Sequence, residues 1–427
     1  GTVAIGYRAG YSITSGAGNA FLGYRAAYSA TDSVDSAIAI GYDAMYSNTD
    51  STGNIAIGYF ALRDGSGGSS TDYNVAIGYA ALRNASPHIS IAIGSNAGQF
   101  LKKSAVGAVH IGHEAGRYAS GSYNISMGYN ALKGTSSAPY ATGANNTAIG
   151  TQAIVALTSG DSNNAIGYQA GYLISSGSNN TLMGYQAGYS LGGTQYNVMI
   201  GDYAGSLSRV INNRQVFGGN SAGRYVDTGI ANVAIGFEAM ESANSSTDNN
   251  ASYNTAVGYQ ALEKITDADY NTAIGQAAAQ NLTTGNQNVF VGNSSGNSSV
   301  SSLYNVMIGV SAGLAATDVD STVLIGWNAG RNTTTDGTIA IGHKALYEHT
   351  TGARNVAIGY QAMQDTNAGS TSLGSTDNIF IGYNAGAGTW VDAASNGNIG
   401  IGSYALDAAM DGALYNTAVG AYAASAI

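Results

Sequence analysis

A short phrase, Asn-x-Ala-Ile-Gly-Tyr-x-Ala, recurs from one end of this chain to the other and limits the folds it can adopt. Its central glycine, called the marker glycine below, can be followed through 24 copies from Gly6 to Gly420, most often 17 residues apart. A repeat of this length is typical of a solenoid, in which each repeat forms one coil and contacts only its neighbours. We therefore expect one continuous parallel β-solenoid over residues 1–427, of about 24 coils of about 17 residues, with no separate anchor, stalk or chaperone domain visible.

The three residues before each marker glycine favour a β-strand, as in Val75-Ala76-Ile77. Side chains alternate across a strand, so the first and third share one face and the middle residue lies on the other. The third is aliphatic in nearly every copy, and we predict that its face forms the inner core. The middle residue is mostly alanine or larger and apolar, and a strand that is apolar on both faces is buried on both. The second face therefore predicts packing against further copies of the chain in a homotrimer. The bulky middle residues predicted to pack between chains are Phe21, Leu182, Met199, Phe290, Met307, Leu324 and Phe380.

Asparagine stands four residues before the marker glycine in 17 of the 24 copies. Side-chain amides that stack on their own kind hydrogen-bond along the stack, so we predict an asparagine ladder along one edge of the solenoid. The alternative is that asparagine here only favours the turn before the strand, which places it at the same corner. The predicted ladder includes Asn54, Asn74, Asn180, Asn197, Asn254, Asn271, Asn305 and Asn355.

The residues that follow the marker glycine predict a tight corner. The third residue after it is alanine in every copy except Ser295, which indicates a site too small for a larger side chain. The fourth is either glycine, as at Gly98, or a bulkier apolar residue, as at Leu82, and we expect a tight corner in the first kind and a filled one in the second. The marker glycine itself indicates a positive φ or a close approach of the next coil.

The stretches between copies are polar and vary in length, as at 64–72, 134–145, 242–252 and 365–377. Insertions of this kind are expected on the outside of a solenoid. The chain also has 30 tyrosines, whose amphipathic rings suit half-exposed positions or stacking on sugars. We favour a structural tyrosine ladder over a glycan-binding platform for those that precede the asparagine position, namely Tyr73, Tyr123, Tyr196, Tyr253, Tyr270, Tyr304 and Tyr415.

Composition excludes several classes of function. The formal charge of -10, with only 15 scattered basic residues, argues against binding to nucleic acid. The absence of cysteine rules out disulfides and thiolate metal sites, and no apolar run is long enough to span a membrane. We expect no cofactor.

Candidate chemical residues are few. His110, His113 and Glu114 bring two imidazoles and a carboxylate close together in sequence, but they do not form the His-Glu-x-x-His motif. We expect packed or solvated histidines there, and equally at His343 and His349. The pairs Asp267/Asp269 and Asp318/Asp320 lack the pattern of calcium-binding β-rolls, so we expect solvated loop acids. We predict no catalytic residues, no metal site and no enzymatic activity.

The repeated phrase resembles two known kinds of repeat. As it stands at 74–81 and 355–362, it resembles the head repeats of YadA-type trimeric autotransporter adhesins, and at 254–261 and 271–278 it is similar to repeats of bacteriophage tail fibre proteins. The resemblance implies a β-roll or β-helix wound with two companions into a homotrimer and used for attachment to a cell surface.

These observations lead us to expect a structural fibre shaft or adhesin that is extracellular or part of a virion, with a cell-surface glycan as a further candidate partner. The alternative is a self-assembling extracellular filament or sheath, in which uncapped solenoid ends stack end to end.

Overall fold

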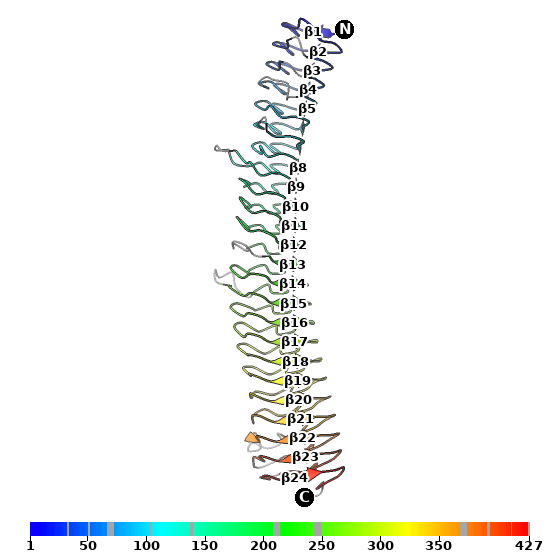
Figure 1. Ribbon diagram of the computed structural model, residues 1–427, viewed down its shortest axis with the longest axis vertical. Helices are drawn as coiled ribbons and strands as arrows, with labels where there is room; N and C mark the ends of the chain where they lie inside the picture. Colours follow the sequence, from blue (N-terminus) through cyan, green and yellow to red (C-terminus); the bar gives the residue numbers. More distant parts are fainter. Residues whose placement is uncertain are drawn as a thin grey trace. The chain divides into compact units, whose positions relative to one another are not determined.

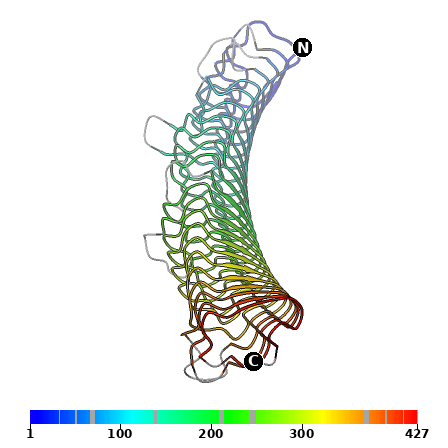
Figure 2. The same cartoon turned by 60° about the horizontal axis from the view of Figure 1, so that its bottom comes forward.

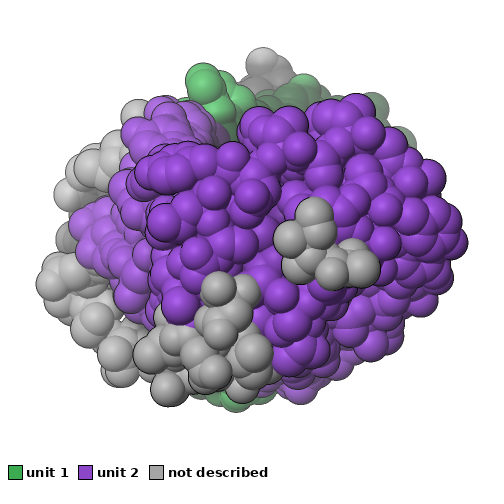
Figure 3. Space-filling view, turned by 90° about the horizontal axis from the view of Figure 1, so that it is seen from below, with its two compact units in different colours: residues 1–214 green, residues 215–427 purple. Residues whose placement is uncertain are grey.

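The computed structural model describes residues 1–31, 34–49, 52–65, 72–102, 104–136, 140–207, 214–242, 249–366, 374–390, 393–410 and 412–425. These residues form an all-β solenoid, as expected, with 24 strands of three residues, one in each copy of the repeat. They group into two compact units, Gly1–Arg214 and Gln215–Ile427, which are coloured separately in Figure 3.

Twelve strands belong to the first unit, and they lie one after another in Figure 1. Their bounds are β1 Val3–Ile5, β2 Ala20–Leu22, β3 Ile38–Ile40, β4 Ile55–Ile57, β5 Val75–Ile77, β6 Ile91–Ile93, β7 Val109–Ile111, β8 Ile125–Met127, β9 Thr147–Ile149, β10 Asn164–Ile166, β11 Thr181–Met183 and β12 Val198–Ile200. Each strand pairs in parallel with the next one along the chain, so equivalent residues of successive repeats lie opposite each other, as Thr181 does with Val198.

The second unit repeats this arrangement. Its strands are β13 Val216–Gly218, β14 Val233–Ile235, β15 Thr255–Val257, β16 Thr272–Ile274, β17 Val289–Val291, β18 Val306–Ile308, β19 Val323–Ile325, β20 Ile339–Ile341, β21 Val356–Ile358, β22 Ile379–Ile381, β23 Ile399–Ile401 and β24 Thr417–Val419. The register is the same, so that Val289, for example, lies opposite Val306.

Backbone hydrogen bonds between coils continue beyond the strands and around the corner. In the coil that follows β11, the amides of Gly184 and Gln186 donate to carbonyls of the preceding coil, and the amide of Gly188 donates to Ala204 of the next coil, each at 2.9 Å. Gln186 and Gly188 both have a positive φ, of 53° and 59°. Figure 2 shows the stacked coils from a second direction. Stacking therefore satisfies backbone groups that would otherwise be lost at such a corner.

The marker glycines combine an unusual backbone conformation with close contact between coils. Gly167 has a φ of +140°, and a Cβ added there would lie 2.3 Å from the carbonyl oxygen of Gly184, the marker glycine of the next coil. No side chain fits in that space, and L-residues strongly disfavour this φ. Both expectations for these glycines are confirmed.

The direction of the strand side chains is the reverse of the one we predicted. The middle residue points into the coil and is buried in every strand from β2 to β24, whereas the first and third residues face outward, as in Ile91 and Ile93. The seven residues assigned to contacts between chains are buried inside their own chain; these are Phe21, Leu182, Met199, Phe290, Met307, Leu324 and Phe380. The prediction was wrong because both faces are apolar, so that alternation alone did not tell inside from outside. The small size of most middle residues is explained by a thin interior.

The middle residue of each strand shares its space with the residue six positions later, at the corner. Where the middle residue is large, the corner residue is usually glycine, and a Cβ on Gly223 would lie 2.4 Å from the ring of Phe217; Phe21, followed by Ala27, is the exception and lies against Gly10 of the preceding coil. Where the middle residue is Ala56, the corner is filled by the buried Leu62. The two kinds of corner expected from the sequence are thus two ways of filling one volume, since interiors of proteins tolerate neither overlap nor voids.

Parts of the variable stretches at 64–72, 134–145, 242–252 and 365–377 lie outside the described ranges, namely 66–71, 137–139, 243–248 and 367–373. The expectation that these stretches form external loops falls partly on those residues.

The shared volume predicts a compensating pair of substitutions. Phe217→Ala should cost about 3–5 kcal/mol through the cavity it leaves, and Gly223→Leu should be destabilising because it overlaps the ring. The double variant should be less destabilised than the sum of the two by more than about 1 kcal/mol, as measured by denaturant midpoints. Gly192→Ala is the control for a glycine with a positive φ but no atom closer than 4.0 Å to the added Cβ. Strict additivity in the double variant would contradict shared space.

Candidate functional surface

The asparagines before the strands form a buried ladder of amides. The side chain of Asn197 donates to Oδ1 of Asn180 at 2.9 Å, and the side chain of Asn180 donates in the same way to Asn163 at 2.9 Å. The same Oδ1 of Asn180 also accepts the backbone amide of Asn197. All eight predicted members take part in such contacts and are almost fully buried: Asn54, Asn74, Asn180, Asn197, Asn254, Asn271, Asn305 and Asn355.

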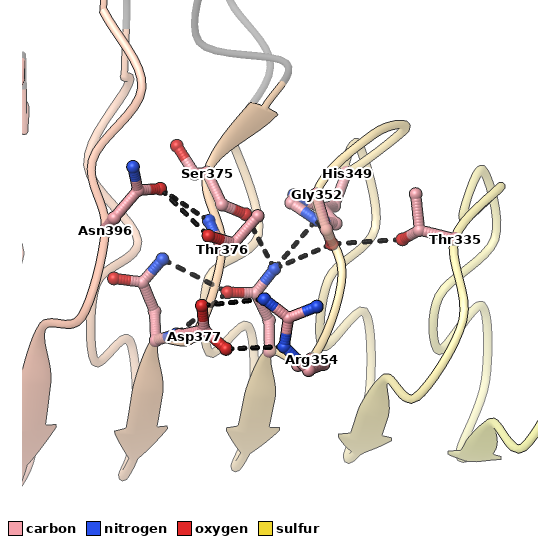
Figure 4. A network of polar contacts seen from close by, with 10 residues as sticks. Thr335, His349, Gly352, Arg354, Ser375, Thr376, Asp377 and Asn396 are labelled. Atoms are coloured by element: carbon pink, nitrogen blue, oxygen red, sulfur yellow. Dashed lines mark hydrogen bonds and ion pairs between the residues drawn. The ribbon is translucent and has the colours of Figure 1, made fainter.

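Several ladder amides also hold the loop beside them. Asn355 donates to the carbonyl of Ser375 at 2.8 Å and to that of Gly352 at 2.9 Å. Figure 4 shows this network around the starts of successive strands, with the Arg354 guanidinium paired to the carboxylate of Asp377 at 2.7 Å. The ladder therefore connects three backbone segments as well as successive side chains, and its oxygens and amides are occupied by the protein itself.

A second row of hydrogen-bond acceptors lies two residues before the asparagines, and the sequence did not lead us to expect it. Asp269 Oδ1 accepts the backbone amide of Ser252, and Asp320 Oδ1 accepts that of Leu303, each at 2.7 Å. Asp318, four residues before the asparagine position, accepts from the amide of Ser301 at 3.1 Å. The loop acids are therefore partners of the preceding coil's backbone. Asp, Asn and Ser serve as acceptors at this position, and other copies carry residues such as Ala, Ile or Leu there, which hid the row from inspection of the sequence.

The outward residues of the strands form a surface that we call the strand face. It comprises the first and third residues of each strand and the residue after the marker glycine. Across all 24 copies, Asp202 is the only Asp, Glu, Lys or Arg at these positions. Its Oδ1 accepts the amide of Tyr185 at 2.9 Å, so part of its charge is compensated within the chain. Charged side chains such as Arg25, Asp43 and Arg63 stand instead at the corner positions, where they pair with one another.

Aromatic rings stack along the strand face. In the first unit Tyr7, Tyr24, Tyr42, Tyr59 and Tyr79 form one stack, with centroids 4.8–5.6 Å apart. In the second unit a comparable row contains Trp327, His343, Tyr360 and Tyr383. Ring faces within these stacks are covered by neighbouring rings, so the stacks offer mainly ring edges and hydroxyls. Sugars stack on open ring faces, and these rows are therefore poorly suited to that mode of binding.

The tyrosines before the asparagine position are only partly a ladder. Tyr253 and Tyr270 stack at 4.9 Å. A Cβ added at Gly53 or Gly107 would lie within 3.0 Å of the ring of Tyr73 or Tyr123, respectively, so these rings cover glycines of the preceding coil. The sequence missed the longer rows on the strand face because tyrosine there alternates with other aromatic and polar residues.

The three candidate residues near position 110 lie in different surroundings. His110 is buried and its Nδ1 lies 2.8 Å from the hydroxyl of Ser126, its partner in the next strand. His113 stacks on Tyr129 on the strand face, while Glu114 is paired with Lys133 at 2.6 Å. Burial lowers the pKa of His110 to about 4. His110 and Ser126 therefore hydrogen-bond to each other on adjacent strands inside the solenoid. The three candidate residues do not converge on one ligand.

His343 and His349 also separate. His343 is part of the aromatic row of the second unit, between Trp327 and Tyr360. His349 is buried and hydrogen-bonded to Thr366 at 2.9 Å, and burial lowers its pKa.

One cluster of acids exists among the described residues that could hold a cation, formed by Glu238, Glu241 and Glu263 with carboxylate oxygens within 4.8 Å of one another. Burial and the neighbouring Glu238 raise the pKa of Glu241. Gln260 donates to Glu238 at 2.8 Å, and Gln280 donates to Glu263, so amide side chains already compensate part of this charge. No observation beyond the acids themselves points to a bound ion.

A cavity of about 330 Å³ lies at β24, lined by Leu406, Met410, Ala418 and neighbouring residues. Its described lining includes the polar side chains of Asn416 and Thr417 and no titratable side chain. No helix in the described part of the chain could cross a membrane.

Comparison with known proteins adds no family assignment. No protein-family model matches the chain, and no curated protein matches it at a significant level.

The ladder predicts a steep cost for losing one buried amide. Asn180→Leu should destabilise the solenoid by at least about 3 kcal/mol, because the amide of Asn197, the carbonyl of Thr194 and the side chain of Asn163 each lose a buried partner. Asn180→Thr should cost less, because Thr322 occupies this position naturally and its amide still bonds to Asn305. Denaturant midpoints measure both, and equal costs would contradict the role of the ladder.

His110 predicts a dependence of stability on pH. Its pKa is about 4 in the folded chain and about 6.5 when unfolded, so the unfolded state binds a proton first as the pH falls. Stability from this residue should be constant above pH ~6.5, fall by about 3 kcal/mol between pH ~6.5 and ~4, and level off below that range.

The matched variant is His110→Phe combined with Ser126→Ala, which recreates the pairing of a large ring with a glycine six residues later, here Gly116. Its unfolding free energy should fall less between pH 6.5 and 4. Some dependence should remain because the pKa of buried His349 is also lowered. An unchanged pH profile would show that His110 does not titrate as described.

Proposed function

We propose that this chain is a structural fibre shaft or adhesin segment of a phage tail fibre or an extracellular surface appendage. The observation that carries the proposal is that polar groups throughout the described repeats form hydrogen bonds between neighbouring coils. Amides, loop acids and buried histidines bond to neighbouring coils, and none of the candidate groups is arranged for catalysis. Such a chain is suited to bearing load and to spacing other parts of an assembly.

The proposal places the chain outside the cell or on a virion, as a homotrimer that contributes to attachment at a cell surface, without enzymatic activity. Low charge and dense hydrogen bonding between coils support this, because stability then depends little on ionic strength. We also propose a cell-surface glycan as a receptor. Its site is not the stacked aromatic rows, because their ring faces are covered by neighbouring rings.

Electron microscopy tests this function. The purified chain should form discrete rods of one length, and gold-labelled antibodies should decorate an appendage of the cell or virion that produces it. Labelling confined to the cell interior would overturn the proposal. Fibres of indefinite length would favour the filament alternative.

A further inference from the structure

The strand face is a continuous apolar surface on each unit that the chain itself leaves uncovered. Ile166, Met183 and Ile200 lie on successive strands, with exposed fractions of 37%, 43% and 45%. Tyr168 and Tyr185 continue this surface past the marker glycines and stack at 5.0 Å. Large contiguous apolar patches on a soluble protein mark sites of association.

The distribution of charge shows that this surface differs from the rest of the exterior. The chain has 40 charged residues, and only Asp202 falls on the strand face. Corner positions a few residues away carry the ion pairs, for example Arg25 with Asp43 and Lys133 with Glu114. Depletion of charge with enrichment of tyrosine is the composition of a buried interface core.

The area is sufficient for a stable contact. In the first unit, eight tyrosines of the strand face have exposed fractions of 39–58%; these are Tyr7, Tyr24, Tyr42, Tyr59, Tyr79, Tyr129, Tyr168 and Tyr185. If each ring exposes about 80 Å², they contribute about 600 Å² together. The aliphatic residues beside them bring the face to at least the ~800 Å² per partner of a standard interface.

We propose that the strand face is where copies of this chain pack against one another, strand face to strand face. The repeat supplies the reason for choosing a second copy as the occupant. Side chains recur on this face at the spacing of the strands, with ring centroids 4.8–5.6 Å apart, and another copy presents the same spacing over the same length. A partner surface without this repeated spacing could match the side chains of only a few strands. This inference deepens the proposed fibre function and rests on it for the homo-oligomeric state.

Charged substitutions on one face test the proposal. Ile166→Lys combined with Met183→Lys places two cations on adjacent rungs, and both side chains point outward, so the coil interior is unchanged. Leu173→Lys is the matched control, because Leu173 is aliphatic, 41% exposed and in the same coil but off the strand face. Sedimentation should give an oligomer for the natural chain and the control, and at least tenfold weaker association for the double variant. Circular dichroism checks that each variant is folded.

Labelling of the natural chain gives an independent readout that needs no variant. Hydroxyl radicals should modify Tyr196 and Tyr304, which are 56% and 60% exposed and lie off the strand face, and should spare Tyr168 and Tyr185 in the oligomer. Equal labelling of the four tyrosines, or dissociation of the control to the same extent as the double variant, would overturn the inference.

A monomeric natural chain would also overturn it, leaving a different occupant such as a polysaccharide for this face. Such a monomer would also remove the homotrimer from the proposed function, but it could still decorate an appendage in the microscope, so the fibre function and the contact through the strand face fail separately.

Discussion

The backbone contact between marker glycines is the constraint on which the rest of this structure depends. The carbonyl of Gly184 occupies the space where Gly167 would carry a Cβ, and within each unit the marker glycines from Gly6 to Gly184 and from Gly219 to Gly402 meet their successors in the same way. Hydrogen bonds then run between coils both in the strands and around the corner, through residues with positive φ such as Gln186. A conformation that is unfavourable for one residue is held in place because each neighbour adopts it too.

Side chains adapt to this backbone in two separate layers. Inside, the middle residue of the strand and the corner residue divide one volume, which is why Phe217 requires Gly223 and Ala56 accompanies Leu62. A similar division holds between adjacent strands at β22 and β23, because a Cβ on Gly400 would lie 2.7 Å from the ring of Phe380. Along the edge, asparagines and loop acids satisfy the polar groups of the turn, so that burial costs little free energy.

The sequence was sufficient for the period, the strands, the parallel stacking and the asparagine ladder, because each depends on residues that recur at fixed positions. It did not predict correctly which face of each strand points into the solenoid and which points outward. Ala76 and Ile77 are both apolar, and alternation does not say that Ala76 is the buried one; in β13 the buried residue is the large Phe217. The row of Asp269 and Asp320 was missed since several residue types serve as acceptors there. The partner surface was expected, but on the wrong side of the strand.

The repeated backbone contact has a consequence for how such a chain can change in length. Neighbouring coils meet through main-chain atoms and through a glycine that is the same in every copy, and a large side chain is accommodated by a small residue of its own coil, as Phe217 is by Gly223, or of the adjacent coil, as Phe380 is by Gly400. A whole coil can therefore be duplicated or deleted by recombination between repeats without disturbing the register of those that remain. Within the repeated phrase a partial insertion does not fit, because it would place a side chain against the carbonyl of the next coil, whereas the stretches between copies already differ in length. The phrase can thus vary only in steps of one repeat, and single residues can be added or lost only between copies.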